Sequence, residues 1–509
     1  MCNCLWGVKV YMSLKMTKNK EKVLEFLNNR EYSFIEPIFS EAGGEFIEYT
    51  IDRVGTIFNE NAKYVKPRKM LENFLVYIFL YITHILTMAG PVRQIQTLLK
   101  DEVCLRLLGF SEDEIKNGVT KRKGDNQYGA DYERQSGAMG TTALVDNLAF
   151  FDKDSLIKCF NLYIGKLKAE GIDFGSEYAL DSTIIETDKD YPGAKVIRKT
   201  NEDGEDTNEY VYGFKLWILS SVKTRIPVAL HVGTANEADA PLLKQIVETG
   251  VSNIGASTIK TLLIDRGFIN GEVLHQIKYE MGIDWCCPAK KNMDIYKDVT
   301  TLREMNKDKI ETWEYGSHGL SGGFLVKGAV SYDQYSKENI GFKKNKTGSP
   351  INAVCITMWA GKEIAVGREK VIMTSADVNS AKEIQQIYKK RSLIENCTFR
   401  ELKQGATVNQ LPVTKKHEKA ENLAYIHVIL SVFAFSIFNA IVEEVNSEPN
   451  NTKKLPQCIR EFRFTQKSQK ANLFVLVDVY YAVITMKEFM DTIGFKRVSS
   501  PFDSDFGFY

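Results

Sequence analysis

Three acidic residues have the types and positions to do chemistry together. Asp181 lies in an apolar stretch typical of a strand, and Asp265 ends a second such stretch. Glu395 lies in a segment without Gly or Pro, whose apolar residues recur near helical spacing. If the two strands are neighbours, the aspartates lie side by side and the helix can bring the glutamate over them. The sequence therefore predicts a cluster of three carboxylates.

Such a cluster predicts a metal site. Three neighbouring carboxylates cannot all stay ionised without a counter-ion, and oxygen-only ligands favour Mg²⁺ or Mn²⁺ over zinc. Two such ions roughly 4 Å apart can activate a water or a 3′-hydroxyl and stabilise the leaving oxygen of an in-line phosphoryl displacement. Asp181, Asp265 and Glu395 are thus predicted to be catalytic, metal-binding residues for two ions.

Each acid also has an ordinary structural interpretation when it is taken alone. Asp181 could cap a turn, and Asp265 could form a strand-end ion pair with Arg266. Glu395 lies four residues after Arg391 and seven after Tyr388, so the three could simply share an exposed helix face. The order of all three acids on the expected elements favours the metal site.

The expected elements around these acids follow the ribonuclease-H-like order. Three strands with short connections predict an antiparallel meander, and the later strands are apolar enough to be buried and parallel. A further helix, beginning near Ser380 as its N-cap, would carry Glu395. The preceding elements are expected over 178–185, 210–219, 226–232 (strands), 238–249 (helix), 261–264 (strand), 271–281 (helix) and 284–287 (strand).

The predicted fold class is α/β, or α+β overall, with a ribonuclease-H-like mixed sheet interrupted by a β-rich insertion. Helical regions are expected on both sides of this core, and the N-terminal one could bind DNA or be a structural cap. Strands in the insertion are expected at 323–327, 353–359 and 370–374. The predicted regions are 1–110 (helical), 111–175 (connector and helices), 176–291 (core), 292–375 (insertion), 376–445 (final core helices) and 446–509 (tail).

Composition narrows the class of protein without identifying it. The chain has 509 residues with a formal net charge of +1, so any basic surface must be local. Nine scattered cysteines without zinc-site spacing fit a reduced cytosolic setting. No signal peptide is evident, and Met12 or Met16 could be the true start. The apolar runs 74–88 and 423–442 carry polar residues and are expected to be buried core helices, not membrane spans.

Several spaced motifs resemble those of a known family. Tyr388-x2-Arg391-x3-Glu395 is similar to the Tyr-Arg-Glu-Lys signature of a group of bacterial insertion-sequence transposases of the DDE superfamily. Leu180-Asp-Ser-Thr and Leu263-Ile-Asp-Arg-Gly-Phe surround the first two acids, and Asn236-Glu-Ala-Asp precedes the first crossover helix. The resemblance covers roughly residues 105 to 440.

The resemblance implies a DNA transposase that cleaves element ends with Mg²⁺ and transfers the strand into target DNA. Asp181, Asp265 and Glu395 would be its metal-binding triad, and Tyr388 and Arg391 would contact transposon-end phosphates. The implied partners are double-stranded DNA, as terminal inverted repeats and target, and a second copy of the chain on paired ends. The implied location is the bacterial cytosol or nucleoid, without a membrane.

One position departs from the family signature. The family places Lys seven residues after Glu, whereas Leu402 stands there and Lys403 follows one residue later. On a regular helix Lys403 points about 100° away from the expected direction. A π-bulge would absorb the extra residue, and we expect one here; otherwise Lys403 is simply solvated.

Local basic residues are further candidates for DNA contacts, alongside the interpretation that they form exposed lysine-rich faces. Lys215 and Lys290 lie near predicted strand ends beside the acids. Trp313 or Trp359 could stack on an unpaired base, although core packing is favoured for both. Basic clusters occur at 389–391, at 343–346 and at 415–416.

Two other functions stay open at this point. One is a metal-dependent nuclease that cuts without joining. The other is an inactive transposase derivative that binds DNA but does not cut; the intact triad argues against it.

Overall fold

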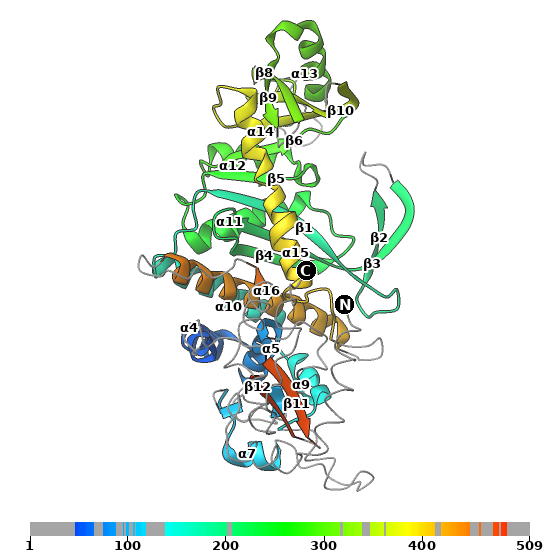
Figure 1. Ribbon diagram of the computed structural model, residues 1–509. Coiled ribbons are helices and arrows are strands. Elements are labelled where there is room, and N and C mark those ends of the chain that lie inside the picture. Colours follow the sequence, from blue (N-terminus) through cyan, green and yellow to red (C-terminus); the bar gives the residue numbers. More distant parts are fainter. Residues whose placement is uncertain are drawn as a thin grey trace, which may run out of the picture. The chain divides into compact units, whose positions relative to one another are not determined.

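The structure is a computed structural model, and the chain divides into two compact units (Figure 1). One unit comprises Met1–Glu60, Tyr64–Phe151 and Lys454–Tyr509, and the other comprises Asn61–Lys63 and Asp152–Lys453, which includes all three acids. The structure describes residues 46–65, 75–87, 95, 98–100, 105–106, 108–118, 138–200, 206–315, 319–337, 347–360, 363–412, 419–447, 458–459, 472–477 and 480–485.

Five strands of the second unit have the order of a ribonuclease-H-like core. They are β1 (Glu177–Thr187), β3 (Asp206–Ser221), β4 (Pro227–Thr234), β5 (Thr261–Ile264) and β6 (Asp284–Pro288). Strand β3 pairs antiparallel with both β4 and β1, whereas β5 lies parallel between β1 and β6. The predicted meander and the predicted parallel pairing are both confirmed.

The apolar pattern explains why these strands are central. Leu262, Leu263 and Ile264 of β5 are all fully buried, as expected of a parallel strand covered on both faces. The crossover helices α11 (Leu243–Ile254) and α12 (Gly271–Tyr279) connect β4 to β5 and β5 to β6. Burial of these connections against the sheet holds the carboxyl ends of β1 and β5 in register.

A long hairpin extends from the core, made by β2 (Lys195–Thr200) and the first half of β3. Figure 1 shows it projecting beyond the sheet. Strand β2 is not among the strands that we expected from the sequence. The backbone groups of β2 form hydrogen bonds with the long strand β3. The charged side chains of β2 can therefore stay in solvent.

The β-rich insertion continues the same sheet. It contains β7 (Glu311–Tyr315), β8 (Gly319–Ala329), β9 (Ile351–Ala360) and β10 (Glu363–Thr374), and β10 pairs antiparallel with β6. The three strands predicted here lie within β8, β9 and β10. Strand β7 and the helix α13 (Asp294–Met305) were not predicted.

The segment that carries the third acid begins as predicted. The Ser380 hydroxyl accepts a hydrogen bond from the Glu383 N–H at 3.2 Å and caps α14 (Ala381–Lys389). After a turn at Lys390 and Arg391, a π-helix (Ile394–Phe399) leads into α15 (Arg400–Gln404). Figure 1 shows this yellow segment crossing from the insertion strands toward β1.

Two long helices, α10 (Lys153–Ala169) and α16 (Ala420–Ser447), complete the core of this unit. The rings of Phe160 and Tyr163 on α10 contact Phe433 on α16, with centroids 5.6 and 5.3 Å apart. Helix α16 is long and apolar enough to cross a membrane, but its most apolar window is 94% buried inside the protein. It therefore has the burial of a core helix, as we predicted.

His427 on α16 makes the fold sensitive to acid. Burial lowers the pKa of this imidazole to about 4, although its contact with the Thr407 carbonyl oxygen, 3.2 Å from Nε2, acts in the opposite direction. The unfolded state takes up a proton below its pKa of 6.5, whereas the folded state does so only near pH 4. The free energy of unfolding should therefore fall by roughly 3 kcal/mol as the pH drops through this window.

The variant His427→Gln tests this expectation, because glutamine does not titrate there. Urea unfolding of both proteins at pH 7 and pH 4.5 should show the difference in stability shrinking or reversing at the lower pH. An equal loss of stability in the two proteins would rule out His427 as the cause.

The other unit contains α4 (Phe46–Asn61), α5 (Leu75–Thr87), η3 (Leu98–Lys100), α7 (Glu112–Asn117), α9 (Thr141–Leu148) and a hairpin of β11 (Asn472–Val477) with β12 (Tyr480–Thr485). Side chains of α5 are almost all buried, which agrees with the predicted core helix. Phe58 meets Phe79 edge to face, with ring centroids 6.1 Å apart. Helix α7 begins with a capping box between Ser111 and Glu114.

Some predicted features lie wholly or largely outside the described residues. These are the start of the chain with Met12 and Met16, much of the helical region expected at 1–110, the basic residues at 343–346 and 415–416, most of the tail expected at 446–509 and the side chain of Trp359. The cysteines within the described residues are all free thiols.

Candidate functional site

The first two acids meet at the ends of adjacent parallel strands. Leu180 of β1 lies opposite Ile264 of β5, so Asp181 and Asp265 are the next residues on neighbouring strands. The Asp181 carboxylate accepts a hydrogen bond from the Ser182 N–H at 2.8 Å and is 7% exposed. The predicted juxtaposition of the two aspartates is thus produced by strand register.

Arg391 joins the first acid to the third. Its guanidinium lies 2.6 Å from Asp181 Oδ2 and 2.9 Å from Glu395 Oε1. Glu395 lies in the π-helix, which contacts β1, and its side chain is 51% exposed. The turn at Arg391 and the π-helix after it thus bring Glu395 to the β1 side of the site.

Burial is the main reason why charge on Asp181 is unfavourable, and it raises the pKa of this carboxyl to about 7. Arg391 and the Ser182 N–H lower the pKa, whereas Asp265 and Glu395 raise it further by smaller amounts. Charge on Asp181 is therefore disfavoured even with Arg391 beside it.

The three predicted ligands fit a divalent cation in donor type, because all of them are carboxylates. Within the described residues, no three His, Cys, Asp or Glu side chains are grouped closely enough to hold a metal ion. Arg391 lies between Asp181 and Glu395, so metal binding requires this side chain to shift.

Tyr388 and Lys370 lie beside this ion-paired group. Tyr388 is 7% exposed, and its hydroxyl has no hydrogen-bond partner in the described structure. The Lys370 ammonium lies 4.8 Å from the centre of the Tyr388 ring, and its residue is exposed. Partial desolvation of the Lys370 side chain lowers the pKa of its ammonium, and the nearby charge of Arg391 lowers it further. The charges of Asp265 and Glu395 act in the opposite direction.

The structure confirms the predicted π-bulge. The π-helix over Ile394–Phe399 lies between Glu395 and Lys403 and absorbs the extra residue that separates them. Lys403 is half-buried on α15, and burial lowers the pKa of its ammonium, while Glu186 of β1 raises it. Lys403 is therefore partly packed and not simply solvated.

If Lys403 makes the DNA contact that the family resemblance implies, Lys403→Met should weaken DNA binding about fivefold. The slope of the salt dependence should also fall by about one phosphate contact. A filter-binding titration at several salt concentrations measures both quantities. Gln404, its exposed neighbour, offers a matched control as Gln404→Met. Equal behaviour of the two variants would remove Lys403 from the interface.

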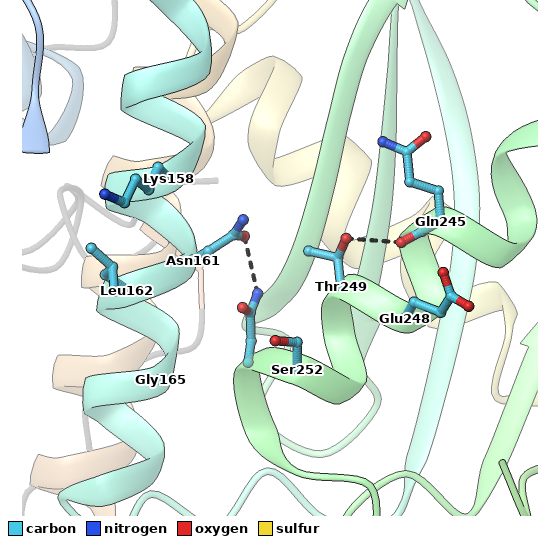
Figure 2. Close-up of a pocket in the computed structure, with 9 residues that line it drawn as sticks. Lys158, Asn161, Leu162, Gly165, Gln245, Glu248, Thr249 and Ser252 are labelled. Carbon is cyan, nitrogen blue, oxygen red and sulfur yellow. Dashed lines mark hydrogen bonds between the residues drawn. The ribbon is translucent and has the colours of Figure 1, made fainter.

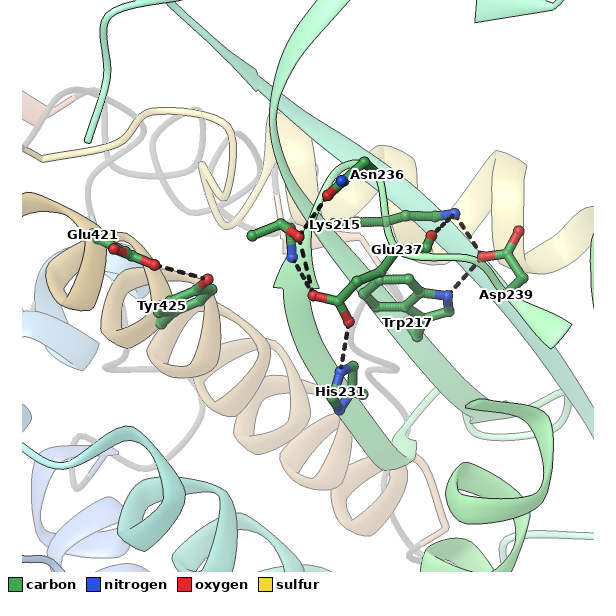
Figure 3. Close-up of polar contacts among 9 residues, drawn as sticks. Lys215, Trp217, His231, Asn236, Glu237, Asp239, Glu421 and Tyr425 are labelled. Atoms are coloured by element: carbon green, nitrogen blue, oxygen red, sulfur yellow. Dashed lines mark hydrogen bonds and ion pairs between the residues drawn. The ribbon is translucent and has the colours of Figure 1, made fainter. Parts of the chain in front are cut away.

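The two other predicted phosphate contacts differ in their surroundings. Lys290 follows β6 and is exposed. Lys215 on β3 is 7% exposed, and its ammonium forms an ion pair with Asp239 at 2.6 Å (Figure 3). Lys215 is thus buried and paired with a carboxylate, so it does not face solvent as a phosphate contact would. A structural role fits Lys215 better than the predicted DNA contact.

A buried polar chain ties the insertion to α14. The Trp313 indole N–H donates to Gln385 Oε1 at 2.7 Å, and the Gln385 amide donates to Ser321 Oγ at 2.9 Å. Trp313 is 9% exposed, so in this structure it packs in the core, which was the favoured interpretation. Gln385 lies one turn before Tyr388 and therefore links the insertion to the helix that leads into the site.

Sequence reasoning missed Lys370, Gln385 and Asp239 as residues around the site. Lys370 was recognised only as the start of a strand, although its position on the last insertion strand before the catalytic helix was a usable signal. Gln385 carried no signal in the sequence. Asp239 belonged to a motif that we quoted, but no role was given to it.

A separate surface hollow lies between α10 and α11 (Figure 2). Two of its lining residues join the helices, because the Asn253 side-chain amide on α11 donates a hydrogen bond to Asn161 Oδ1 on α10 at 3.0 Å. Most of the residues that line it are of polar types, such as Lys158, Gln245, Glu248 and Thr249, and Leu162 is apolar. None of the predicted site residues lines it.

Comparison with known proteins agrees with this geometry. The transposase DDE domain family matches residues 173–433, which include all three acids. No curated protein is significantly similar to this chain. A solved structure, the cryo-EM structure of the piggyBac transposase synaptic complex with hairpin DNA, aligns over 92% of this chain and 86% of that chain, with 12% identity and a TM-score of 0.37. A TM-score this low does not establish a shared fold.

Proposed function

Because the chain belongs to the transposase DDE domain family, we propose that it cleaves DNA at transposon ends and joins the freed ends to target DNA. The observation that carries this proposal is the register of β1 and β5, which makes Asp181 and Asp265 neighbours, with Glu395 linked to Asp181 through Arg391. We further assign it to the bacterial insertion-sequence group with the Tyr-Arg-Glu-Lys signature, acting in the cytosol or nucleoid.

Asp181, Asp265 and Glu395 would hold two Mg²⁺ ions, or Mn²⁺ ions. When bound, these ions would supply activation of the attacking oxygen and stabilisation of the leaving oxygen. In the first reaction water attacks the phosphorus at the element end and a 3′-hydroxyl leaves. In the second, that 3′-hydroxyl attacks a target phosphate, and a target 3′-oxygen leaves with a proton.

The residues of the chain itself hold the DNA and neutralise its charge. Arg391 can exchange its carboxylate partners for a phosphate, because its guanidinium binds both groups through the same paired donors. The unpaired Tyr388 hydroxyl can donate to a phosphate oxygen once the side chain is uncovered. Lys403, Lys290 and Lys370 would add positive charge that attracts the DNA backbone. A second copy of the chain would hold the paired end.

We add Lys370 to the proposed DNA contacts, because its ammonium lies beside the Tyr388 ring. Lys370→Met should weaken end binding by about threefold to tenfold and lower the salt slope by about one. The control is Lys244→Met, which changes a partly exposed lysine on α11 that pairs with Glu248. The same titration would exclude Lys370 if both variants kept the wild-type slope.

A strand-transfer assay tests the joining activity. The substrate is a pre-cut terminal repeat with a free 3′-hydroxyl, incubated with plasmid target and Mg²⁺. Joined product supports the transposase. Cleavage of uncut ends without any joining would favour a metal-dependent nuclease, and binding without either reaction would favour an inactive DNA-binding derivative.

A further inference from the structure

One carboxylate outside the proposed triad holds together the elements that carry it. Asp239 belongs to the Asn236-Glu-Ala-Asp motif between β4 and α11. We propose that Asp239 is a positioning residue that fixes the end of β1, and with it Asp181, against β3 and the turn after Asp265. This inference rests on the proposed metal-dependent function.

A single oxygen of Asp239 receives three donors (Figure 3 shows two of them). The Trp217 indole N–H lies 2.6 Å from Oδ1, the Lys215 ammonium lies 2.6 Å away, and the Ser182 hydroxyl donates at 3.0 Å. Ser182 lies directly opposite Trp217 in the β1–β3 pairing. Asp239 therefore ties both strands at one register position.

The tie acts on Asp181 through the backbone. Ser182 is the next residue after Asp181, and its N–H donates to the Asp181 carboxylate at 2.8 Å. Successive side chains of a strand project to opposite faces. Asp239 thus holds β1 from the face opposite to that of the Asp181 side chain, and it touches no reacting atom.

The other oxygen of Asp239, Oδ2, lies close to the turn that follows Asp265. A side chain placed on Gly267 would come within 2.8 Å of Asp239 Oδ2, so the Asp265-Arg-Gly turn approaches this carboxylate closely because glycine stands there. The short helix η5 (Arg266–Phe268) and η4 (Ala240–Leu242) are in contact. Asp239 thereby spans the two strand ends that carry Asp181 and Asp265.

Neighbouring residues of the motif hold Asp239 in place. The Glu237 carboxylate accepts the Thr234 N–H at 2.7 Å and lies 3.4 Å from His231 Nε2 (Figure 3). The Glu237 carbonyl also lies 3.4 Å from the Lys215 ammonium. The loop is thus folded inward around Lys215, and the position of Asp239 is fixed by the motif itself.

Affinity for Mn²⁺ in the absence of DNA tests this role. Free Mn²⁺ is measured by electron paramagnetic resonance in full-length wild type, Asp239→Ala and Lys215→Met/Asp239→Asn, with Asp181→Asn defining the specific site. We expect Asp239→Ala to bind Mn²⁺ about 10- to 100-fold more weakly. The double variant keeps an acceptor for Ser182 and Trp217 without a buried charge, and should bind within about threefold of wild type.

The control is Asp173→Ala, which removes an exposed carboxylate paired with Lys223 at 2.7 Å; it should leave Mn²⁺ affinity unchanged. Thermal unfolding midpoints show whether each variant is folded. A folded Asp239→Ala protein with wild-type Mn²⁺ affinity overturns the inference while leaving the proposed function intact. The same holds if the double variant binds Mn²⁺ as weakly as Asp239→Ala does. Wild type without Asp181-dependent Mn²⁺ binding overturns both.

Discussion

Asp181→Asn should reduce Mg²⁺-dependent cleavage of transposon-end DNA by about 10³-fold or more, as expected when a group that acts within a catalytic unit is lost. Asp181 is the deepest of the three acids, at 7% exposed, and it lies directly beside Asp265 in the sheet. An asparagine fills the same space but brings no negative charge, so it cannot balance a divalent cation.

The same substitution should leave the fold intact. Burial of the Asp181 carboxylate is unfavourable enough to raise its pKa to about 7, and a neutral side chain avoids this cost. We therefore expect near wild-type unfolding and DNA binding in Asp181→Asn, measured beside cleavage by gel shift and urea titration. Cleavage within about tenfold of wild type, in a folded protein, would remove Asp181 from the reaction.

Arg391→Met should be the most destabilising of the proposed substitutions, by about 3–5 kcal/mol in the DNA-free protein. The side chains of Arg391 and Asp181 are only 13% and 10% exposed, and the guanidinium bridges two carboxylates. Removing it takes away the counter-charge of a buried carboxyl, which must then stay ionised at a cost or take up a proton. Urea unfolding at neutral pH measures the loss.

A double-mutant cycle isolates the cause. Adding Asp181→Asn to Arg391→Met should recover about 2 kcal/mol, because the unpaired charge is gone. As a control, Lys223→Met breaks the exposed Lys223–Asp173 pair and should cost at most about 1 kcal/mol. Strict additivity of the two substitutions would show that Arg391 stabilises the fold by some other contact.

Local patterns were sufficient to predict the core strands and the position of each acid. Apolar stretches of the right length gave β1, β5 and β6, and the capping residue Ser380 gave the start of α14. The single extra residue between Glu395 and Lys403 was enough to predict the π-helix, since a regular helix would misdirect the lysine.

Features that depend on distant partners could not be predicted in this way. Strand β2 forms because β3 continues beyond the sheet to pair with it. Lys215 resembled an exposed strand lysine, but its partner Asp239 lies on a loop that only the tertiary fold brings to it. The Arg391 bridge to Asp181 joins residues 210 positions apart, so the acids could be predicted from local patterns but their counter-charge could not.

Cleavage of a labelled duplex of the element's own terminal repeat, with Mg²⁺ and with Mn²⁺, tests the central claim most directly. Wild type is compared with Glu395→Ala, which removes the one exposed acid of the three and should not disturb the core. We predict cutting at the edge of the repeat by wild type and none by the variant. Binding without cutting by wild type in both metals, or equal cutting by the variant, would contradict the assignment of these three acids to DNA transposition.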